Sequence, residues 1–537
     1  MAIIFKSGTS EPDSLLDLHD IQGSVVKVYA RFGMFKGRYV CFRVNKGNAG
    51  RRFVLLMSSL VTNAAPWKTA VPDATTDIAF TYQGLRALRV PVNTLHGFSD
   101  AFSMGMRARR DILGDTGPSS STTWDPIWKC PGGDQSVHIM VQINGKSVAA
   151  VEKRYQAVLN AVLDANQKEQ QPDGVKLLSG HCDDQRNDLD YQEASLVYKD
   201  GQPTPKEHFG YTDGISDTFF KGTRSDPSLV IGGGKPTGGD PTTMAGWAPL
   251  ETGEFIFGHK DEAFEYPAAP LPTMFSRNGT YLVYRKHHQN VGAFNAFLDE
   301  VGAKFPGGKE ALAAKFSGRW RNGAPITMFP TEDKANQFAA ELAVATEKAQ
   351  SKNATAADKA KLAELALKLV AFDYTHDLDG ANCPRGAHIR RMNPRSSLEF
   401  GVKGAFATPG ALSNRRRILR RGLPYGEVKD PTKSDGNHGV IIMALNADIS
   451  RQFEFIQQQW INFGNDFKLA NDRDPLLGNH GANAEGRMII EGSTATGRPP
   501  FFCSKIPTMV EIRGGDYFFM PSMTCLQMIG LGLVDPT

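Results

Sequence analysis

The sequence predicts an α+β protein, because segments with the two-residue period of a strand are followed by segments with the spacing of a helix. Alternation of apolar and polar residues runs through 25–57, as VVKVYARF, RYVCFRV and RRFVLLM, and returns at 137–144. Apolar residues at helical spacing occur at 94–110 and 148–170. Strand and helix signals in this mixture favour an α+β architecture over strict βαβ alternation.

A segment rich in glycine and proline divides the chain of 537 residues. It begins at Ser225 and ends at Pro249, and helix and strand breakers at this density are typical of a loop or a connector between domains. The sequence therefore predicts an N-terminal domain over 1–225, a connector over 226–249 and a C-terminal domain over 250–537.

The second half again combines strand and helix signals. Its strand candidates are Phe255 to His259, Tyr281 to Arg285, Val440 to Leu445 and Tyr517 to Met520. The stretch 331–369 is rich in alanine, lysine, glutamate and glutamine, which predicts two surface helices around a polar turn. We interpret this stretch as a peripheral helical insertion in the C-terminal domain.

Charge and composition argue against several classes of protein. The net charge is only +4, and the main basic run is Arg415 to Arg417 with Arg420 and Arg421, so neither a nucleic acid nor a membrane is an expected partner. No apolar stretch is long enough to span a bilayer. The segment Met1 to Asp20 lacks the basic start, apolar core and cleavage site of a signal peptide, which predicts a cytoplasmic protein.

The cysteines do not suggest a metal centre or a disulfide framework. The six are far apart and form no CxxC pair; they are Cys41, Cys130, Cys182, Cys383, Cys503 and Cys525. Reduced, buried thiols are therefore expected.

Three clusters carry the candidate chemistry. They are Gly210-Tyr-Thr-Asp-Gly214, Cys383-Pro-Arg-Gly-Ala-His388-Ile-Arg390, and the arginine-rich segment from Arg415 to Gly426. Each also has a structural interpretation: an Asp before Gly is typical of a turn, a single His is often a structural residue, and arginines often cover a solvated helix face. The Gly-Ala step before His388 would let a flat macrocycle approach the backbone, and the fork of Arg390 suits a carboxylate.

Together and in this order, the three clusters closely resemble those of the dye-decolourising peroxidase family, in its longer-sequence branch. The resemblance covers most of the chain and includes Asp20 to Gly23, Pro249 to Phe255, Leu445 to Ile449, Arg451 to Gln458, Asp474 to Leu476 and Gly514 to Pro521. It implies two ferredoxin-like domains with antiparallel sheets and peripheral helices. It also implies one haem b per chain, held mainly by the C-terminal domain.

The resemblance also implies roles for individual residues. His388 matches the iron ligand, and its second ring nitrogen should meet a carboxylate, for which Asp516 is the first candidate and Glu511 the second. Asp213 matches the family's acid–base carboxylate and Arg420 its distal arginine. The predicted cofactor-binding residues are His388, Arg390, Asp213, Gly214, Ile215, Arg420 and Asp516. An unperturbed Asp titrates near about 3.9, so a carboxylate in this role predicts an acidic optimum.

The implied activity is reduction of hydrogen peroxide coupled to one-electron oxidation of dyes, phenolics or other organic donors. The same pocket leaves open an oxidase, Mn(II) oxidation, removal of iron from haem, or haem binding without turnover, and a homo-oligomer also stays open. Tyr425 and the six tryptophans are candidates to relay electrons to the surface, although packing alone would explain any one of them. Two features depart from the family's pattern: Ile442 stands where a phenylalanine is common, and Pro384-Arg-Gly-Ala precedes His388.

Overall fold

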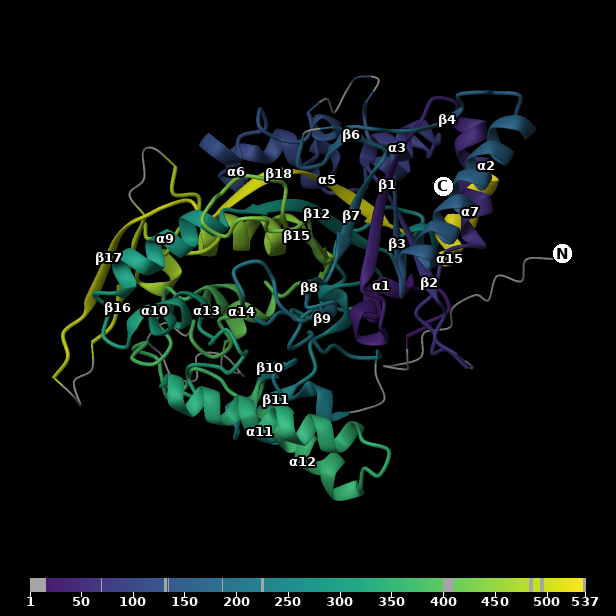
Figure 1. The fold of residues 1–537 in the computed structure, drawn as a ribbon. Coiled ribbons are helices and arrows are strands. Elements are labelled where there is room, and N and C mark those ends of the chain that lie inside the picture. Colours follow the sequence, from purple (N-terminus) through teal and green to yellow (C-terminus); the bar gives the residue numbers. More distant parts are fainter. Residues whose placement is uncertain are drawn as a thin grey trace.

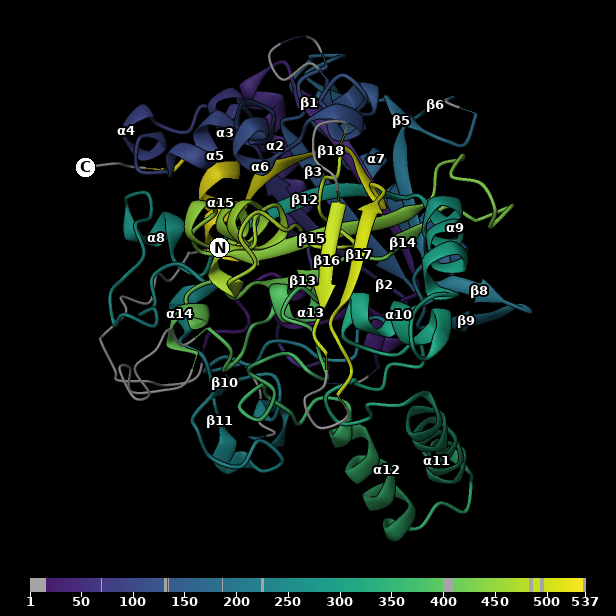
Figure 2. The same cartoon turned by 90° about the vertical axis from the view of Figure 1, so that its left-hand side faces the viewer.

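The computed structural model describes residues 16–68, 70–129, 133, 135–185, 187–223, 227–398, 410–481, 486–492 and 497–534. Cys130 and most of the segment examined for a signal peptide lie outside these residues. A ten-stranded antiparallel sheet runs through the molecule, with helices packed around it (Figures 1 and 2). The α+β class is therefore confirmed.

The strands of this sheet come from both halves of the sequence. Their order is β13 (Leu419–Arg421), β15 (Gly439–Asn446), β12 (Thr280–Gln289), β18 (Val510–Met520), β2 (Ala74–Phe80), β3 (Ile139–Gly145), β1 (Lys36–Val44) and β4 (Val175–Leu177). Two further strands, β14 (Pro424–Tyr425) and β7 (Tyr191–Ser195), pair with β15 and β1.

Each half of the sheet has the ferredoxin-like topology. In the first half, α2 (Gly47–Ser58) follows β1 and α7 (Val148–Lys168) precedes β4. In the second half, α9 (Val291–Gly302) follows β12, and the helical segments Ser450–Glu454 and Ile456–Ile461 lie between β15 and β18. Read in one direction along the sheet, both halves have the same strand order: second, third, first and fourth strand of the half. The halves join where Phe519 of β18 pairs with Phe80 of β2.

Shorter elements surround this framework. The other α-helices of the central body are α1 (Gly23–Val26), α3 (Tyr82–Ala87), α4 (Val92–Leu95), α5 (Asp100–Met104), α6 (Arg110–Leu113), α8 (Thr273–Ser276), α10 (Gly308–Ser317), α13 (His388–Met392), α14 (Ala411–Asn414) and α15 (Met523–Leu531). Four small hairpins pair β5 (His181–Cys182) with β6 (Asp188–Leu189), β8 (Val197–Lys199) with β9 (Gln202–Thr204), β10 (Lys235–Pro236) with β11 (Trp247–Ala248), and β16 (Gly486–Ile490) with β17 (Phe501–Ile506).

The alanine-rich stretch forms two helices at the edge of the molecule, α11 (Glu332–Gln350) and α12 (Ala356–Lys368) (Figures 1 and 2). Thr355 caps α12 by accepting from the Asp358 amide, while the Asp358 carboxylate accepts from the Thr355 amide. Among the described helices, none combines the length and the apolar character that a bilayer-spanning helix requires. The five described cysteines are buried, as expected.

Most of the predicted strands and helices are confirmed, but three segments differ. The segment 51–57 lies in α2, because Phe53, Val54 and Met57 are buried at helical rather than alternating spacing. The segment 25–32 forms parts of α1 and a 3-10 helix at Tyr29–Phe32. Phe255 to His259 forms no strand, since its three consecutive apolar residues are all buried in an irregular segment. The domain boundaries stay predictions.

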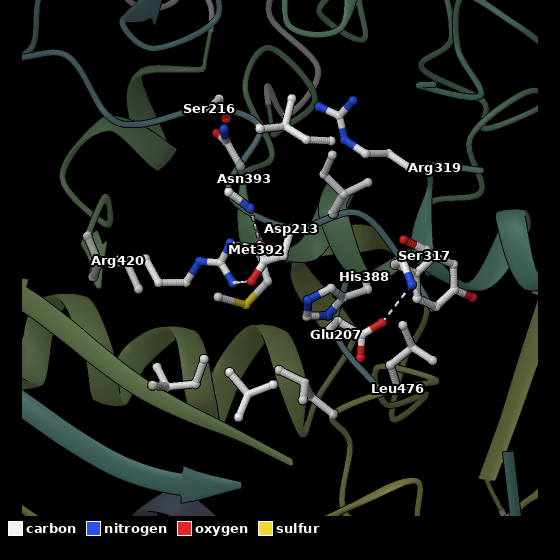
Figure 3. Close-up of a pocket in the computed structure, with 18 of the residues that line it drawn as sticks. Glu207, Asp213, Ser216, Ser317, Arg319, His388, Met392, Asn393, Arg420 and Leu476 are labelled. Atoms are coloured by element: carbon white, nitrogen blue, oxygen red, sulfur yellow. Dashed lines mark hydrogen bonds and ion pairs between the residues drawn. The ribbon is translucent and has the colours of Figure 1, made fainter. Parts of the chain in front are cut away.

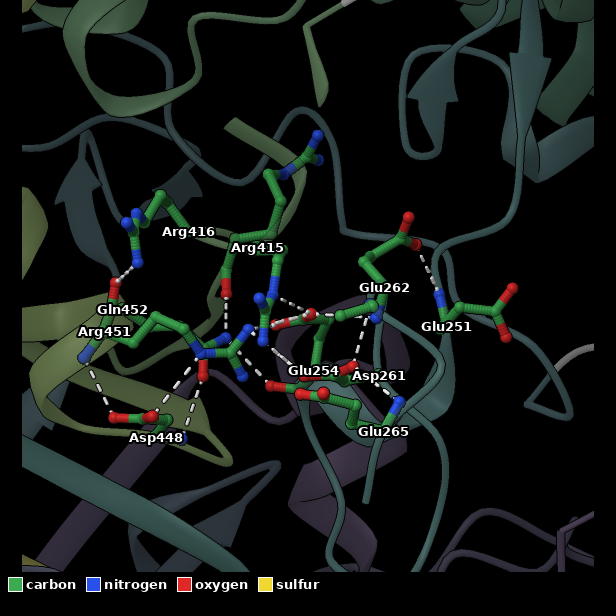
Figure 4. Close-up of polar contacts among 12 residues, drawn as sticks. Glu251, Glu254, Asp261, Glu262, Glu265, Arg415, Arg416, Asp448, Arg451 and Gln452 are labelled. Carbon is green, nitrogen blue, oxygen red and sulfur yellow. Dashed lines mark hydrogen bonds and ion pairs between the residues drawn. The ribbon is translucent and has the colours of Figure 1, made fainter. Parts of the chain in front are cut away.

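A network of arginines and carboxylates anchors the segment that leads into β13 (Figure 4). Arg451 Nη1 lies 3.0 Å from Glu254 Oε2, and Arg415 Nη2 donates to Asp261 Oδ2 at 2.8 Å. Gln452 donates to the backbone oxygens of Glu254 and Arg417. The arginine-rich segment is therefore tied to 254–261 and does not form a solvated helix face.

Replacing Glu254 by Ala should destabilise the protein, because this fully buried carboxylate is the nearest of three that pair with Arg451, the others being Asp261 at 3.5 Å and Asp448 at 3.4 Å. Breaking a buried pair in this way costs about 3–5 kcal/mol, whereas removal of an exposed one costs about 0–1 kcal/mol. Glu364→Ala, which removes the exposed pairs of Glu364 with Lys361 and Lys368, is the matched control. Equal denaturant midpoints for the two variants would show that the network does not stabilise the fold.

Candidate active site

A cavity of about 360 Å³ lies beside the second half of the sheet and contains the three residues singled out in the sequence, Asp213, His388 and Arg420 (Figure 3). Its walls come from β12, β13, β15, β18, α13, the segment 205–218 and the helical segment 450–461. Residues separated by 207 positions in sequence, Asp213 and Arg420, meet in it.

His388 is presented by a loop that its own polar groups stabilise. The Asp377 carboxylate accepts from the amides of Asn382 and Cys383, both at 2.8 Å, and Arg390 lies 3.6 Å from the same carboxylate. The loop ends at Ala387, and α13 begins with His388 itself. The imidazole is thereby fixed at the first position of a short helix.

Asp474 holds the imidazole ring in place. Its Oδ2 atom lies 2.9 Å from Nδ1 of His388, and its Oδ1 atom accepts from the amides of Leu476 and Leu477. Burial of Asp474 opposes ionisation, but the charge and hydrogen bond of His388 outweigh it and hold the pKa of the carboxyl below its usual value. An ionised carboxylate only accepts, so Nδ1 donates, and Nε2 is the nitrogen left for a ligand in the cavity.

The prediction that Asp516 or Glu511 pairs with His388 is wrong. Asp516 accepts from the amides of Met106 and Tyr517, and burial raises its pKa to about 6. It lines a separate, smaller pocket, so the predicted contact between Asp516 and the cofactor is not supported either. Glu511 instead accepts from Asn290 and Arg513.

Arg390 does not line the cavity, which contradicts its predicted role as a cofactor contact. The side chain is 1% exposed, and it donates to the backbone oxygens of Cys383 and Leu378. Its function in the structure is to hold the loop before His388. Arg319 and Asn393 do border the cavity, and the Oδ1 atom of Asn393 is buried with no hydrogen-bonding partner among the described residues.

Asp213 and Arg420 form a two-bond ion pair on the cavity wall. Arg420 Nη1 donates to Asp213 Oδ2 at 3.0 Å, and Nη2 donates to the other carboxylate oxygen. The amide of Gly214, which has a φ of +71°, donates to Asp213 Oδ1 at 2.7 Å. Burial opposes ionisation of Asp213, but the charge and hydrogen bonds of Arg420 outweigh it and lower its pKa. Gly214 and Ile215 line the same cavity.

The rest of the wall is mostly apolar, with two further carboxylates, Glu207 and Asp217. Ile442, the residue expected to replace an aromatic, borders the cavity together with Val440 and Val510. Glu207 accepts from the amides of Phe209 and Tyr211, and burial raises its pKa. The described residues contain no group of three or more His, Cys, Asp or Glu side chains arranged to hold a metal ion.

The proposed electron-relay residues lie mostly inside the protein. Tyr425 is 1% exposed, so it is not itself a surface oxidation site. Five tryptophans are also buried, namely Trp124, Trp128, Trp247, Trp320 and Trp460. Trp67 is the tryptophan that retains partial exposure.

Comparisons with known proteins agree with this architecture. The family model described as "DyP dimeric alpha+beta barrel domain" matches residues 57–176. Peroxidase 2 of Mycetinis scorodonius is 27% identical over 95% of this chain and 87% of its own length. The solved structure of an ancestral D-type dye-decolourising peroxidase has a TM-score of 0.70 at 26% identity, covering 96% of this chain and 99% of the other. A dye-decolourising peroxidase in complex with 2,6-dimethoxyphenol has a TM-score of 0.68 at 21% identity, covering 96% and 100%.

Asp474→Asn should lower the free energy of unfolding at neutral pH by about 1.5–3 kcal/mol, the usual worth of a hydrogen bond to a charged group. The pKa of Asp474 is depressed in the folded protein, so this stabilisation is present above the unfolded value of about 3.9 and disappears as pH falls through the folded value. Urea denaturation at pH 7 and in steps below pH 4 measures the free energy of unfolding of both proteins.

The matched control is Asp200→Asn, at an exposed aspartate with a φ of +52°, which Asn tolerates. If the free energy of unfolding differed between wild type and Asp474→Asn by the same amount at every pH, the assignment of Asp474 as an ionised partner would be contradicted.

Proposed function

Because this chain belongs to the dye-decolourising peroxidase family, we propose that it is a haem-dependent peroxidase whose working site is the cavity around Asp213, His388 and Arg420. The observation that carries this assignment is the convergence of two ion pairs on one cavity. One pair, His388 with Asp474, orients an imidazole. The other, Asp213 with Arg420, offers an acid–base group beside a permanent positive charge.

The residues of the cavity fit a haem. The size of the cavity lies within the usual range for cofactor sites, about 300–1,000 Å³, and its sheet wall is apolar at Val440, Ile442 and Val510. An imidazole whose Nδ1 donates to a buried carboxylate is a typical metal-binding histidine. Arg319 and Asn393 border the cavity and offer partners to the polar edge of a ligand. The guanidinium of Arg319 suits a carboxylate, and the unpartnered Oδ1 atom of Asn393 suits a donor or a bridging water.

In this proposal His388 would hold the iron through Nε2, and Asp474 would keep the ring in the correct tautomer and raise its donor strength. Bound haem would supply the redox chemistry, taking two oxidising equivalents from peroxide and passing them singly to donors. The chain's own contribution is to exclude bulk water, fix the imidazole and manage protons and charge at the substrate.

Asp213 and Arg420 act on the peroxide. The Asp213 carboxylate accepts the proton from one peroxide oxygen and returns it to the oxygen that leaves as water. Arg420 cannot lose its proton in the working pH range, so it stabilises the negative charge that develops as the O–O bond breaks. A protein that only bound haem would have no use for this pair, and their pairing on the cavity wall therefore favours turnover over simple binding.

A dye-decolourising peroxidase of this fold has been solved with 2,6-dimethoxyphenol, which supports organic electron donors in this proposal. We propose phenolics and dyes as donors for this chain as well. A cytoplasmic location remains a proposal from the sequence.

The experiment that tests the assignment compares two substitutions in one pocket. His388→Ala should abolish or greatly weaken haem binding, seen as loss of the Soret band after reconstitution. Arg420→Leu should keep the band and lower the rate of reaction with peroxide by about 10²–10³-fold, as for removal of one stabilising donor.

Circular dichroism of both apoproteins controls for folding. Full haem occupancy with an unchanged spectrum in His388→Ala would show that a different residue holds the iron.

The pH dependence follows from the lowered pKa of Asp213. Since Arg420 holds the carboxyl ionised, its basic form persists below the ordinary value of about 3.9, and the peroxide reaction should remain fast in acid until Asp213 is protonated. Asp213→Asn should remove this acid limb and slow the reaction by about 10²–10⁴-fold. Stopped-flow rates across the acidic range measure both effects, and an acid limb unchanged in Asp213→Asn would contradict this role.

A further inference from the structure

A second polar ring faces the cavity from the sheet. His287 lies on β12, where it pairs in register with Val440 of β15 on one side and Ile512 of β18 on the other. Alternation along the strand places His287 and Gln289 on the cavity wall, next to the apolar Val440 and Ile442. The sheet wall therefore contains an imidazole within an otherwise largely apolar patch.

The ring of His287 is not explained by packing. It is 7% exposed, and its Nε2 atom is buried with no hydrogen-bonding partner among the described residues. Buried polar groups in native proteins are normally paired, so an unpaired imidazole on a cavity wall indicates a ligand or a water that completes it. Burial, assisted by the positive charges of Arg285 and His388, lowers the pKa of His287 to about 3. The ring is therefore neutral, with one nitrogen that donates and one that accepts.

Arg285 on its own strand and His388 on α13 are the charged groups that act on the pKa of His287. The other charged side chains that line the cavity are Arg31, Glu207, Asp213, Asp217, Arg319, Arg395, Arg417 and Arg420. Asp213 is engaged by Arg420, and Glu207 accepts from Gln289 and two backbone amides. Asp213 and His287 both line this one cavity.

We propose that His287 is a second acid–base residue for hydrogen peroxide, acting alongside Asp213; this inference rests on the proposed peroxidase function. An O–H bond of the peroxide breaks, its electron pair stays on oxygen, and the proton moves to the free lone pair of the imidazole, giving hydroperoxide and imidazolium. As the O–O bond breaks, its electron pair goes to the leaving oxygen, and the imidazolium returns the proton to that oxygen to give water. Bound haem would supply the two electrons that the remaining oxygen requires. Negative charge on the neighbouring oxygen raises the proton affinity of the ring as the transfer proceeds.

The proposal gives the cavity two independent proton acceptors of different chemistry. Asp213 is a carboxylate locked to a guanidinium, whereas His287 is a neutral ring with no such partner. Removal of Asp213 alone would therefore leave a residual path for the proton, and removal of both groups would close it.

The test uses reconstituted holoprotein and four variants: Asp213→Asn, His287→Leu, His287→Asn and the double variant Asp213→Asn/His287→Leu. Stopped-flow measurement of the peroxide reaction should show that His287→Leu is slower than wild type by about 10-fold, and the double variant slower than Asp213→Asn by about 10²-fold, at the low end of acid–base effects. His287→Asn, which keeps polarity but is not a base, should resemble His287→Leu. His288→Gln is the matched control, because His288 bonds to the His438 and Ser434 backbone oxygens and not to the cavity.

Cyanide binding supplies a readout that does not depend on turnover. Hydrogen cyanide must lose its proton to bind as the anion, so loss of a proton acceptor should weaken its affinity about 10-fold in His287→Leu, measured by the shift of the Soret band. Equal rates and equal cyanide affinities in Asp213→Asn and the double variant would overturn the role of His287. A wild-type protein without a Soret band would instead overturn the proposed function itself.

Discussion

Strand β12 is hydrogen-bonded along both edges, to β15 and to β18, and all ten of its residues are buried. This double pairing constrains the rest of the site, because a strand held on both sides cannot shift its register without exchanging its two faces. His287 and Gln289 are thereby fixed on the cavity wall. Arg420 is fixed indirectly, since β13 pairs with β15, which pairs with β12.

Burying so polar a strand requires compensation by charges from elsewhere. Arg285 pairs with Asp115 and Lys286 with Asp125, at 2.6 and 2.7 Å between side chains that are almost completely buried. Both carboxylates come from the first half of the chain, so the charges of the second half are neutralised across the sheet. Removing either partner would leave a buried charge without its counter-charge. The fold would then be destabilised by more than the intact pair stabilises it.

Charged groups of the cavity are also paired, but the two pairs differ in which partner acts on the other. Each of the cavity's two key carboxylates is kept ionised by one neighbour, Asp474 by an imidazole and Asp213 by a guanidinium. In the first pair the carboxylate serves the ring by fixing its orientation. In the second pair the arginine lowers the pKa of the carboxyl and so sets the pH range in which Asp213, the reactive group under our proposal, is basic.

Much of the fold and the central site could be predicted from the sequence. The strong alternation at 137–144 and the helical spacing at 148–170 correspond to β3 and α7, and the clusters around Asp213, His388 and Arg420 do converge. The segment 51–57 was wrongly predicted as strand-like, because Phe53, Leu55 and Met57 fit a strand while Phe53, Val54 and Met57 fit a helix equally well.

The partner of His388 lay beyond sequence reasoning for a physical reason. Asp474 is 86 positions away, and only the folded chain brings the two together. The segment Asp474 to Leu476 was noted as a motif, but nothing local distinguishes its carboxylate from that of Asp516, which is satisfied by backbone amides elsewhere. Arg390 was misassigned because a guanidinium suits backbone oxygens as well as it suits a ligand carboxylate.

The position of β18 has a consequence for how the protein is made. This strand is the last of the sheet in sequence, yet it lies in the middle, between β12 and β2, and supplies Val510 to the cavity. Until it leaves the ribosome the two halves have no shared sheet, and the cavity lacks part of its wall. If a cofactor fills this cavity, as we propose, it could be captured only after β18 has joined the sheet, so a nascent chain stalled before residue 510 would not yet hold it.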